Sequence, residues 1–70
     1  MAAPVSYRLV EGVPHYRFHV SLVLTTGKRV RLVHWSPGYP WVRAEVTQRL
    51  MNLYRVDEIK PGSVTIRQEP

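Results

Sequence analysis

Two runs of alternating apolar and polar residues dominate this chain, and the segment Thr25–Lys28 joins them. A period of two in both runs predicts paired strands with one buried face. The buried face would comprise Tyr16, Phe18, Val20, Leu22, Leu24, Val30 and Leu32. The opposite face would comprise Arg17, His19, Ser21, Val23, Arg29, Arg31, Val33 and Trp35.

The connection between the two runs predicts how the strands are aligned. Residues 25–27 form a three-residue hairpin loop in which Gly27 supplies the left-handed conformation of a glycine bulge. Leu22 then lies opposite Val30, so apolar residues pair with apolar residues. A slip of one residue would break this match, and we therefore expect this register alone.

The segments before the hairpin are shorter and less regular. Residues 5–10 predict a short strand that ends at Glu11 and Gly12, and the next strand runs from about residue 15 to residue 25. Pro14 cannot donate a backbone hydrogen bond, so we place it at a strand edge or in the connection. Residues 1–4 are expected to be an untethered terminus.

A helix is predicted after the break at residues 36–40. It should run from about Pro40 to Tyr54, with Pro40 as its first residue, where the missing N–H is not needed. Four apolar residues follow the spacing of a single buried stripe. They are Val42, Val46, Leu50 and Leu53.

A last strand follows the turn at Pro61 and Gly62, because Val64 and Ile66 alternate with polar residues and need a sheet edge to be buried. The chain is thus predicted to be a single small α+β domain over residues 1–70. Its antiparallel sheet would have three to four strands in the order β-β-β-α-β, with one helix packed on one face. Without cysteine, neither a disulfide nor a thiolate metal site can stabilise so small a core.

The charge of the chain limits its partners. Ten basic residues face five acidic ones, giving a formal charge of +5 and a pI near 10.3. This excess attracts polyanions, either nucleic acid or an acidic protein surface. Most of the basic residues are arginines, whose planar fork meets phosphate or carboxylate with two hydrogen bonds. A GC-rich gene would produce the same preference for arginine, although not the charge excess.

The titratable residues do not form a pattern typical of catalysis or metal binding. His15 and His19 are separated by about 13 Å on a strand, and His34 points to the opposite face. Asp57 and Glu58 are adjacent, so on a strand their side chains would diverge. No serine lies in a glycine-flanked elbow. We therefore expect a protein that is not an enzyme and that has no metal and no cofactor.

The polar face of the hairpin carries the strongest functional signal. Arg17 lies opposite Trp35 in the predicted register, where a cation–π contact would contribute about 0.5–1 kcal/mol. Sheets can enter the DNA major groove, and sheet aromatics can stack single-stranded bases. Val23 and Val33 fit a protein interface about as well. The residues predicted to bind nucleic acid or an acidic partner are Arg17, His19, Lys28, Arg29, Arg31 and Trp35.

A second surface is predicted on the helix. Trp41 and Met51 fall away from the buried stripe, and both residue types are enriched at the centres of protein interfaces. Alternatively, Trp41 folds over the turn at residues 37–40 and closes one end of the core.

The stretch from residue 16 to residue 50 resembles DNA-binding domains that place a three-stranded sheet in the major groove. The ethylene-response domains of plants and the arm-binding domains of tyrosine recombinases are examples. The matching features are the aromatic-led strand at residues 16–20, the Gly27-Lys28-Arg29 turn, the aromatic Trp35 and the helix that follows. The resemblance implies DNA contacts by the sheet arginines, here Arg17, Arg29 and Arg31.

Two segments depart from that pattern. Residues 37–40 replace the usual short polar entry to the helix, and the last strand at residues 64–66 has no counterpart. The resemblance therefore does not establish membership of these families.

From the sequence we expect a small non-enzymatic binding protein of nucleic acid, with DNA before RNA. The alternative is a regulator or inhibitor of the phage or mobile-element type, docking on an acidic surface of a larger protein. No apolar run reaches the roughly 20 residues of a membrane span, so we expect a soluble, cytoplasmic protein.

Overall fold

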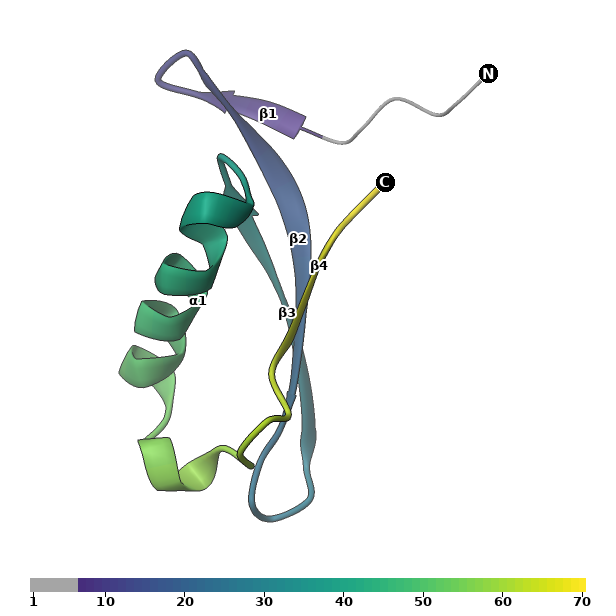
Figure 1. Ribbon diagram of the computed structural model, residues 1–70, viewed down its shortest axis with the longest axis vertical. Coiled ribbons are helices and arrows are strands. Elements are labelled where there is room, and N and C mark those ends of the chain that lie inside the picture. Colours follow the sequence, from purple (N-terminus) through teal and green to yellow (C-terminus); the bar gives the residue numbers. More distant parts are fainter. Residues whose placement is uncertain (1–6) are drawn as a thin grey trace.

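The computed structural model describes residues 7–70 and has the predicted α+β order β-β-β-α-β (Figure 1). Residues 1–4, expected to be an untethered terminus, and the first two residues of the predicted first strand lie outside this region. The elements are β1 (Tyr7–Val10), β2 (Val13–Val23), β3 (Arg29–Ser36), α1 (Tyr39–Leu53), the short 3-10 helix η1 (Val56–Glu58) and β4 (Thr65–Gln68).

The long strand β2 is the centre of an antiparallel sheet. β3 pairs along one edge of β2. Along the other edge, β4 pairs with residues 18–21 and β1 with residues 13–16, so β4 and β1 follow one another on the same side. The last strand therefore does join a sheet edge, and that edge belongs to β2.

The hairpin of β2 and β3 has the predicted register. Leu22 pairs with Val30, and the Leu24 N–H donates to the Lys28 carbonyl at 2.8 Å. Gly27 has a φ of 91°, in the left-handed region that a three-residue loop with a glycine bulge requires. Loop length and alternation together therefore specify this hairpin.

The hairpin of β1 and β2 turns through Glu11 and Gly12. Both residues have positive φ, at 51° and 79°, as in a type I′ turn. Pro14 lies within β2 but beyond the Tyr16–Ser36 pair at which β3 ends. Its missing N–H therefore removes no hydrogen bond from the pairing with β3.

Helix α1 covers one face of the sheet (Figure 1). It begins one residue before the predicted start, so Pro40 is its second residue, and the Gly38 carbonyl accepts from the Val42 N–H at 2.9 Å. Side chains from β2 and α1 form the core, each at most 4% exposed. They are Phe18, Val20, Leu22, Val42, Val46 and Leu50.

The prediction that Leu53 completes the buried stripe is wrong. Leu53 is the last residue of α1 and is 57% exposed. At Tyr54 the backbone becomes extended, with φ −136° and ψ 155°, so helical spacing no longer determines which side chains face the core. Tyr54 packs against the core in its place.

The segment around η1 fastens the end of α1 to the tip of the hairpin. The Thr25 N–H donates to the Glu58 carbonyl at 2.8 Å, and the Lys60 N–H donates to the Val23 carbonyl at 2.9 Å. Val64 precedes β4 and is 38% exposed, so Ile66 is the better buried of the two residues predicted to be covered. Neither α1 nor η1 has the length and apolar character that crossing a bilayer requires.

Candidate nucleic-acid interface

One face of the sheet is covered by α1, and no helix formed by residues 7–70 lies on the opposite face (Figure 1). We call the opposite face the outer face. Strand alternation and the observed register place one set of side chains on it. The set comprises Arg8, Val10, Val13, His15, Arg17, His19, Ser21, Val23, Arg29, Arg31, Val33, Trp35, Thr65, Arg67 and Glu69.

The register arranges these side chains in rows across three strands. Arg67, His19 and Val33 form one row, since His19 pairs with both of the others. The next row is formed by Thr65, Ser21 and Arg31. The Ser21 and Thr65 hydroxyls are hydrogen-bonded to each other in the middle of this row. β4 and β3 therefore contribute one arginine each, and the two arginines lie in adjacent rows on opposite sides of β2.

The end of the outer face near Trp35 is internally paired. Arg8 from β1 lies over the Trp35 ring, 4.4 Å from its centroid. Arg17 is opposite Trp35 as predicted, but its Nε lies 3.1 Å from Glu69 Oε2. The expected cation–π contact is therefore made by Arg8 and not by Arg17, because the side-chain carboxylate of Glu69 attracts the Arg17 guanidinium.

Glu69 supplies negative charge to this end of the face. Its Oε2 is shielded from solvent and lies 3.3 Å from His19 Nε2 as well as near Arg17. Neither contact has hydrogen-bond geometry, and the contact with Arg17 is an ion pair. Arg17 is thus partly neutralised, and two of the predicted binding residues are engaged within the protein itself.

The other cations of the outer face are not engaged in this way. Arg29 and Arg31 on β3 and Arg67 on β4 are exposed, as is Lys28 at the hairpin turn. Within residues 7–70, no carboxylate lies within 4.0 Å of any of these four groups. The end of the sheet near the hairpin turn is therefore a surface of uncompensated positive charge.

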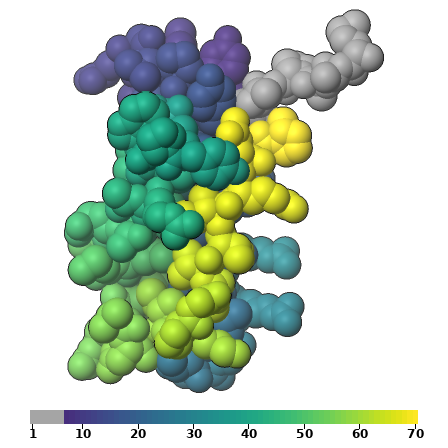
Figure 2. All heavy atoms as spheres, in the orientation of Figure 1, coloured from purple at the N-terminus to yellow at the C-terminus, as the bar shows by residue number. Residues whose placement is uncertain are grey.

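The middle of the outer face is hollowed. A shallow concavity of about 580 Å³ is bordered by Arg31 on one side and Arg67 on the other, with the Ser21 and Thr65 hydroxyls between them. In the space-filling view, side chains of β3 project past the yellow C-terminal strand on the side away from the helix (Figure 2). Two guanidinium groups, and the one hydroxyl proton that the Ser21–Thr65 hydrogen bond leaves free, can together donate hydrogen bonds to an anionic group in this hollow.

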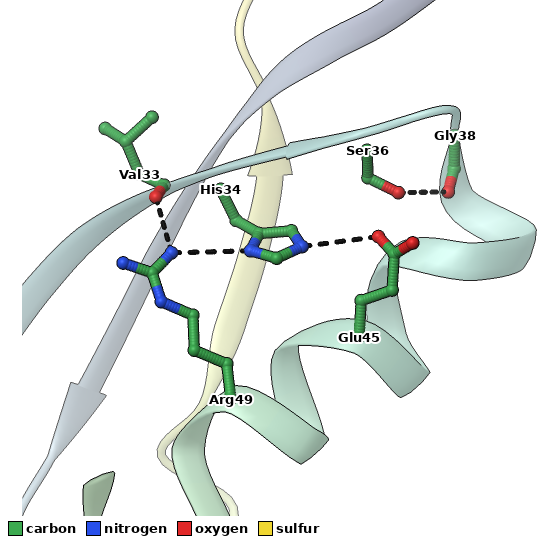
Figure 3. A network of polar contacts seen from close by, with 6 residues as sticks. All are labelled: Val33, His34, Ser36, Gly38, Glu45 and Arg49. Atoms are coloured by element: carbon green, nitrogen blue, oxygen red, sulfur yellow. Dashed lines mark hydrogen bonds and ion pairs between the residues drawn. The ribbon is translucent and has the colours of Figure 1, made fainter. Parts of the chain in front are cut away.

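His34 lies on the helix-covered face, as its parity predicts. Its Nε2 lies 3.2 Å from Glu45 Oε1, and its Nδ1 lies 3.3 Å from Arg49 Nη1 (Figure 3). Arg49 Nη1 also donates to the Val33 carbonyl at 2.7 Å. This network ties α1 to β3, and it engages both ring nitrogens of His34.

The neighbouring serine is occupied as well. Ser36 is fully buried, and its hydroxyl donates to the Gly38 carbonyl at 3.4 Å (Figure 3). Among residues 7–70, no cluster of three histidine, cysteine, aspartate or glutamate side chains has the spacing of a metal site.

The two residues of the predicted helix surface lie apart. Trp41 is 54% exposed, and a Cβ built on Gly38 would lie 3.6 Å from its ring, so the ring folds over the turn. Met51 is 65% exposed and borders a groove between α1 and β4. They therefore belong to different surfaces.

Three charged members of the outer face were not predicted as site residues. Arg67 and Glu69 could have been found from the alternation of the last strand. Because Ile66 must face the core, the odd-numbered residues of this strand must face outward. Arg8 gave no such signal, since its place depends on the pairing of β1 with β2.

No protein-family model, curated protein or solved structure matches the chain.

Proposed function

We propose that this protein binds nucleic acid, duplex DNA in the first place, through the outer face of its sheet. One observation carries the proposal. Arg29, Arg31 and Arg67 stand on the uncovered face without a carboxylate partner in the described part of the chain. Arginines held this way bind phosphate oxygens or guanine edges with paired hydrogen bonds.

The spacing of these arginines suits a duplex. Arg31 lies two positions after Arg29 along β3, an advance of roughly 6.7 Å, close to two base-pair steps of about 3.4 Å. Arg31 and Arg67 lie on strands separated by β2, which are roughly 10 Å apart, and the offset of two residues between their rows places them roughly 12 Å apart. The major groove is about 12 Å wide, so a sheet of this width can enter it or bridge its phosphates.

The outer face is less suited to single strands. Proteins that bind single-stranded nucleic acid stack bases on several aromatic side chains. On the described outer face, Trp35 is the only tryptophan, tyrosine or phenylalanine, and Arg8 already covers its ring. The unpaired arginines of this face therefore suit a duplex better than its single aromatic side chain suits base stacking.

An acidic protein surface is the second candidate partner. Val23 and Val33 are half-buried on the outer face among the arginines, and phosphate binding makes no use of them. A protein partner would cover these valines and pair its carboxylates with Arg31 and Arg67. The two candidates differ in salt dependence and in the effect of removing Trp35.

The test is a titration of labelled duplex and single-stranded DNA at several salt concentrations. We expect log affinity for the duplex to fall linearly with log salt, with a slope of about −0.9 for each neutralised phosphate. Arg31→Ala and Arg67→Ala should each reduce the slope by about one. The matched control is Arg43→Ala, which removes the same charge from an exposed position on α1.

Two outcomes would contradict the proposal. The first is no binding of duplex DNA at about 50 mM salt, where attraction between a +5 protein and DNA is strong. The second is an equal loss of affinity in Arg31→Ala and Arg43→Ala, which indicates general attraction to net charge. Either outcome would favour the protein partner if the wild type also binds to an acidic protein and Trp35→Ala abolishes that binding.

A further inference from the structure

β4 is an edge strand whose outward backbone groups lack a partner strand. The Glu69 N–H donates to the Arg17 carbonyl at 2.8 Å, so the odd-numbered residues of this segment bond to β2. In an antiparallel ladder the intervening residues then point away from β2. Of the outward N–H groups, that of Gln68 donates to the Tyr39 hydroxyl at 3.1 Å. Those of Val64 and Ile66 face no strand within residues 7–70.

An apolar groove runs beside this edge, between β4 and α1. Its volume is about 340 Å³. Several of its apolar side chains are strongly exposed for their type, Met51 at 65% and Val56 at 87%. The yellow C-terminal strand and the green helix that border it lie next to each other on the surface in Figure 2. The main apolar residues of the groove are Tyr39, Leu50, Met51, Val56, Val64 and Ile66.

Two unpaired cations flank the edge. Arg43 borders the groove from α1, and Arg67 lies on the outer-face side of β4. No carboxylate of the described region lies within 4.0 Å of either guanidinium. The edge therefore combines free backbone donors and acceptors, an apolar hollow on one side and unpaired cations on the other.

We propose that β4 binds an extended segment of a partner protein, which adds to the sheet as a further strand. Side chains of such a strand alternate between the two faces of the sheet. Those on one face would enter the groove, and those on the other would lie beside Thr65 and Arg67. The segment recognised is therefore one in which apolar and acidic residues alternate.

A second copy of this chain fits the edge less well. Pairing two β4 strands would bring Arg67 of each copy to the same short ladder and would join two molecules of charge +5. The peptide surface is also separate from the arginines of β3. It shares Thr65 and Arg67 with the proposed DNA surface, so groove variants such as Met51→Glu, which change neither residue, separate peptide binding from DNA binding.

The probe is a soluble peptide of about seven residues, an ordinary strand length, in which valine and glutamate alternate. Its control has the same composition with the glutamates in one block. In amide NMR spectra of the whole protein, we expect the alternating peptide to shift signals along residues 64–68 and around the groove. The Ile66 amide should also exchange more slowly. The control peptide should bind at least about tenfold more weakly, because it cannot satisfy both faces at once.

Two pairs of variants test the contacts. Val64→Pro removes an outward N–H and should weaken binding about tenfold, whereas Val64→Thr keeps the N–H and should bind nearly as wild type. Met51→Glu places a charge in the groove and should weaken binding at least as much. Gln48→Glu makes the same charge change at an exposed helix position outside the groove. Duplex DNA affinity of Val64→Pro should equal that of the wild type.

The proposal is overturned if the two peptides bind equally, or if the shifted signals lie on β3 and not along residues 64–68. Unchanged peptide affinity in Met51→Glu would also overturn it. The proposal would also be overturned if sedimentation showed dimerisation through residues 64–68 and adding the peptide shifted no NMR signals. A protein that binds the peptide but not DNA would refute the proposed DNA binding and leave this inference standing.

Discussion

The guanidinium of Arg8 lies over the indole of Trp35, 4.4 Å from the ring centroid. The contact joins β1 to β3 across β2, so it fastens the short N-terminal hairpin to the rest of the outer face. A double-mutant cycle of Arg8→Ala with Trp35→Leu should give a coupling of about 0.5–1 kcal/mol in urea unfolding. The same cycle with Arg17→Ala should give a coupling near zero, because Arg17 pairs with Glu69. A larger coupling for Arg17 than for Arg8 would contradict the observed arrangement.

Gly27 gives a prediction about the hairpin turn. Its φ is 91°, and a Cβ built on it would meet nothing within 4 Å, so substitution is opposed by the backbone and not by a clash. Gly27→Ala should lower the free energy of unfolding by about 1 kcal/mol or more. Gly27→Asn should cost less, because asparagine tolerates the left-handed region. Equal melting temperatures for the wild type and Gly27→Ala would show that the turn is built differently in solution.

Leu50 and Leu53 allow a matched test of the helix phase. Leu50 is 4% exposed and Leu53 is 57% exposed, although the sequence places both on one stripe. Leu50→Ala should cost roughly 2–5 kcal/mol, and Leu53→Ala should stay within about 0.5 kcal/mol, as exposed substitutions do.

Leu50→Ala can unfold so small a domain completely. The milder Leu50→Val, with an expected loss of about 1 kcal/mol, then provides a measurable midpoint in urea. Equal losses for Leu50→Ala and Leu53→Ala would refute the arrangement of the last helical turn.

His34 gives a prediction that needs no mutation. Arg49 Nη1 can only donate, so the contact at 3.3 Å makes His34 Nδ1 an acceptor, and the proton of the neutral ring lies on Nε2, toward Glu45. Long-range proton–nitrogen NMR spectra of the imidazole should show this tautomer. In Arg49→Leu, the constraint on Nδ1 is removed, and a mixture of tautomers is expected. A wild-type ring protonated on Nδ1 alone would exclude the Arg49 contact.

The sequence predicts local features of this fold better than distant ones. The register of the hairpin follows from alternation and loop length, both encoded within residues 16–35. The burial of Val42, Val46 and Leu50 follows in the same way from helical spacing. Leu53 was misplaced because the helix ends there, and the backbone change at Tyr54 leaves no periodic signal.

The pairing within the outer face depends on chain segments far apart. Arg17 was expected to contact Trp35 because the hairpin alone determines that register. The true partners, Glu69 for Arg17 and Arg8 for Trp35, come from the two ends of the described chain. Their positions depend on which edge of β2 each terminal strand joins, and two short strands carry little information about that choice.

Glu69 provides a prediction in which affinity for DNA increases. Its carboxylate, held beside Arg17 and His19, offsets positive charge on the outer face. Glu69→Gln should release Arg17 for phosphate binding and should steepen the salt dependence by about one phosphate contact. At roughly 0.1 M salt this corresponds to at most about a tenfold gain in affinity for duplex DNA.

The control for Glu69→Gln is Glu45→Gln, which makes the same charge change on the helix side and keeps an acceptor oxygen for His34. Because Glu45 lies behind the sheet, its replacement should change the salt slope far less. Equal gains in the two variants would mean that net charge alone attracts the DNA. A gain confined to Glu69→Gln, and abolished when Arg17→Ala is added, would locate the phosphate contact at Arg17.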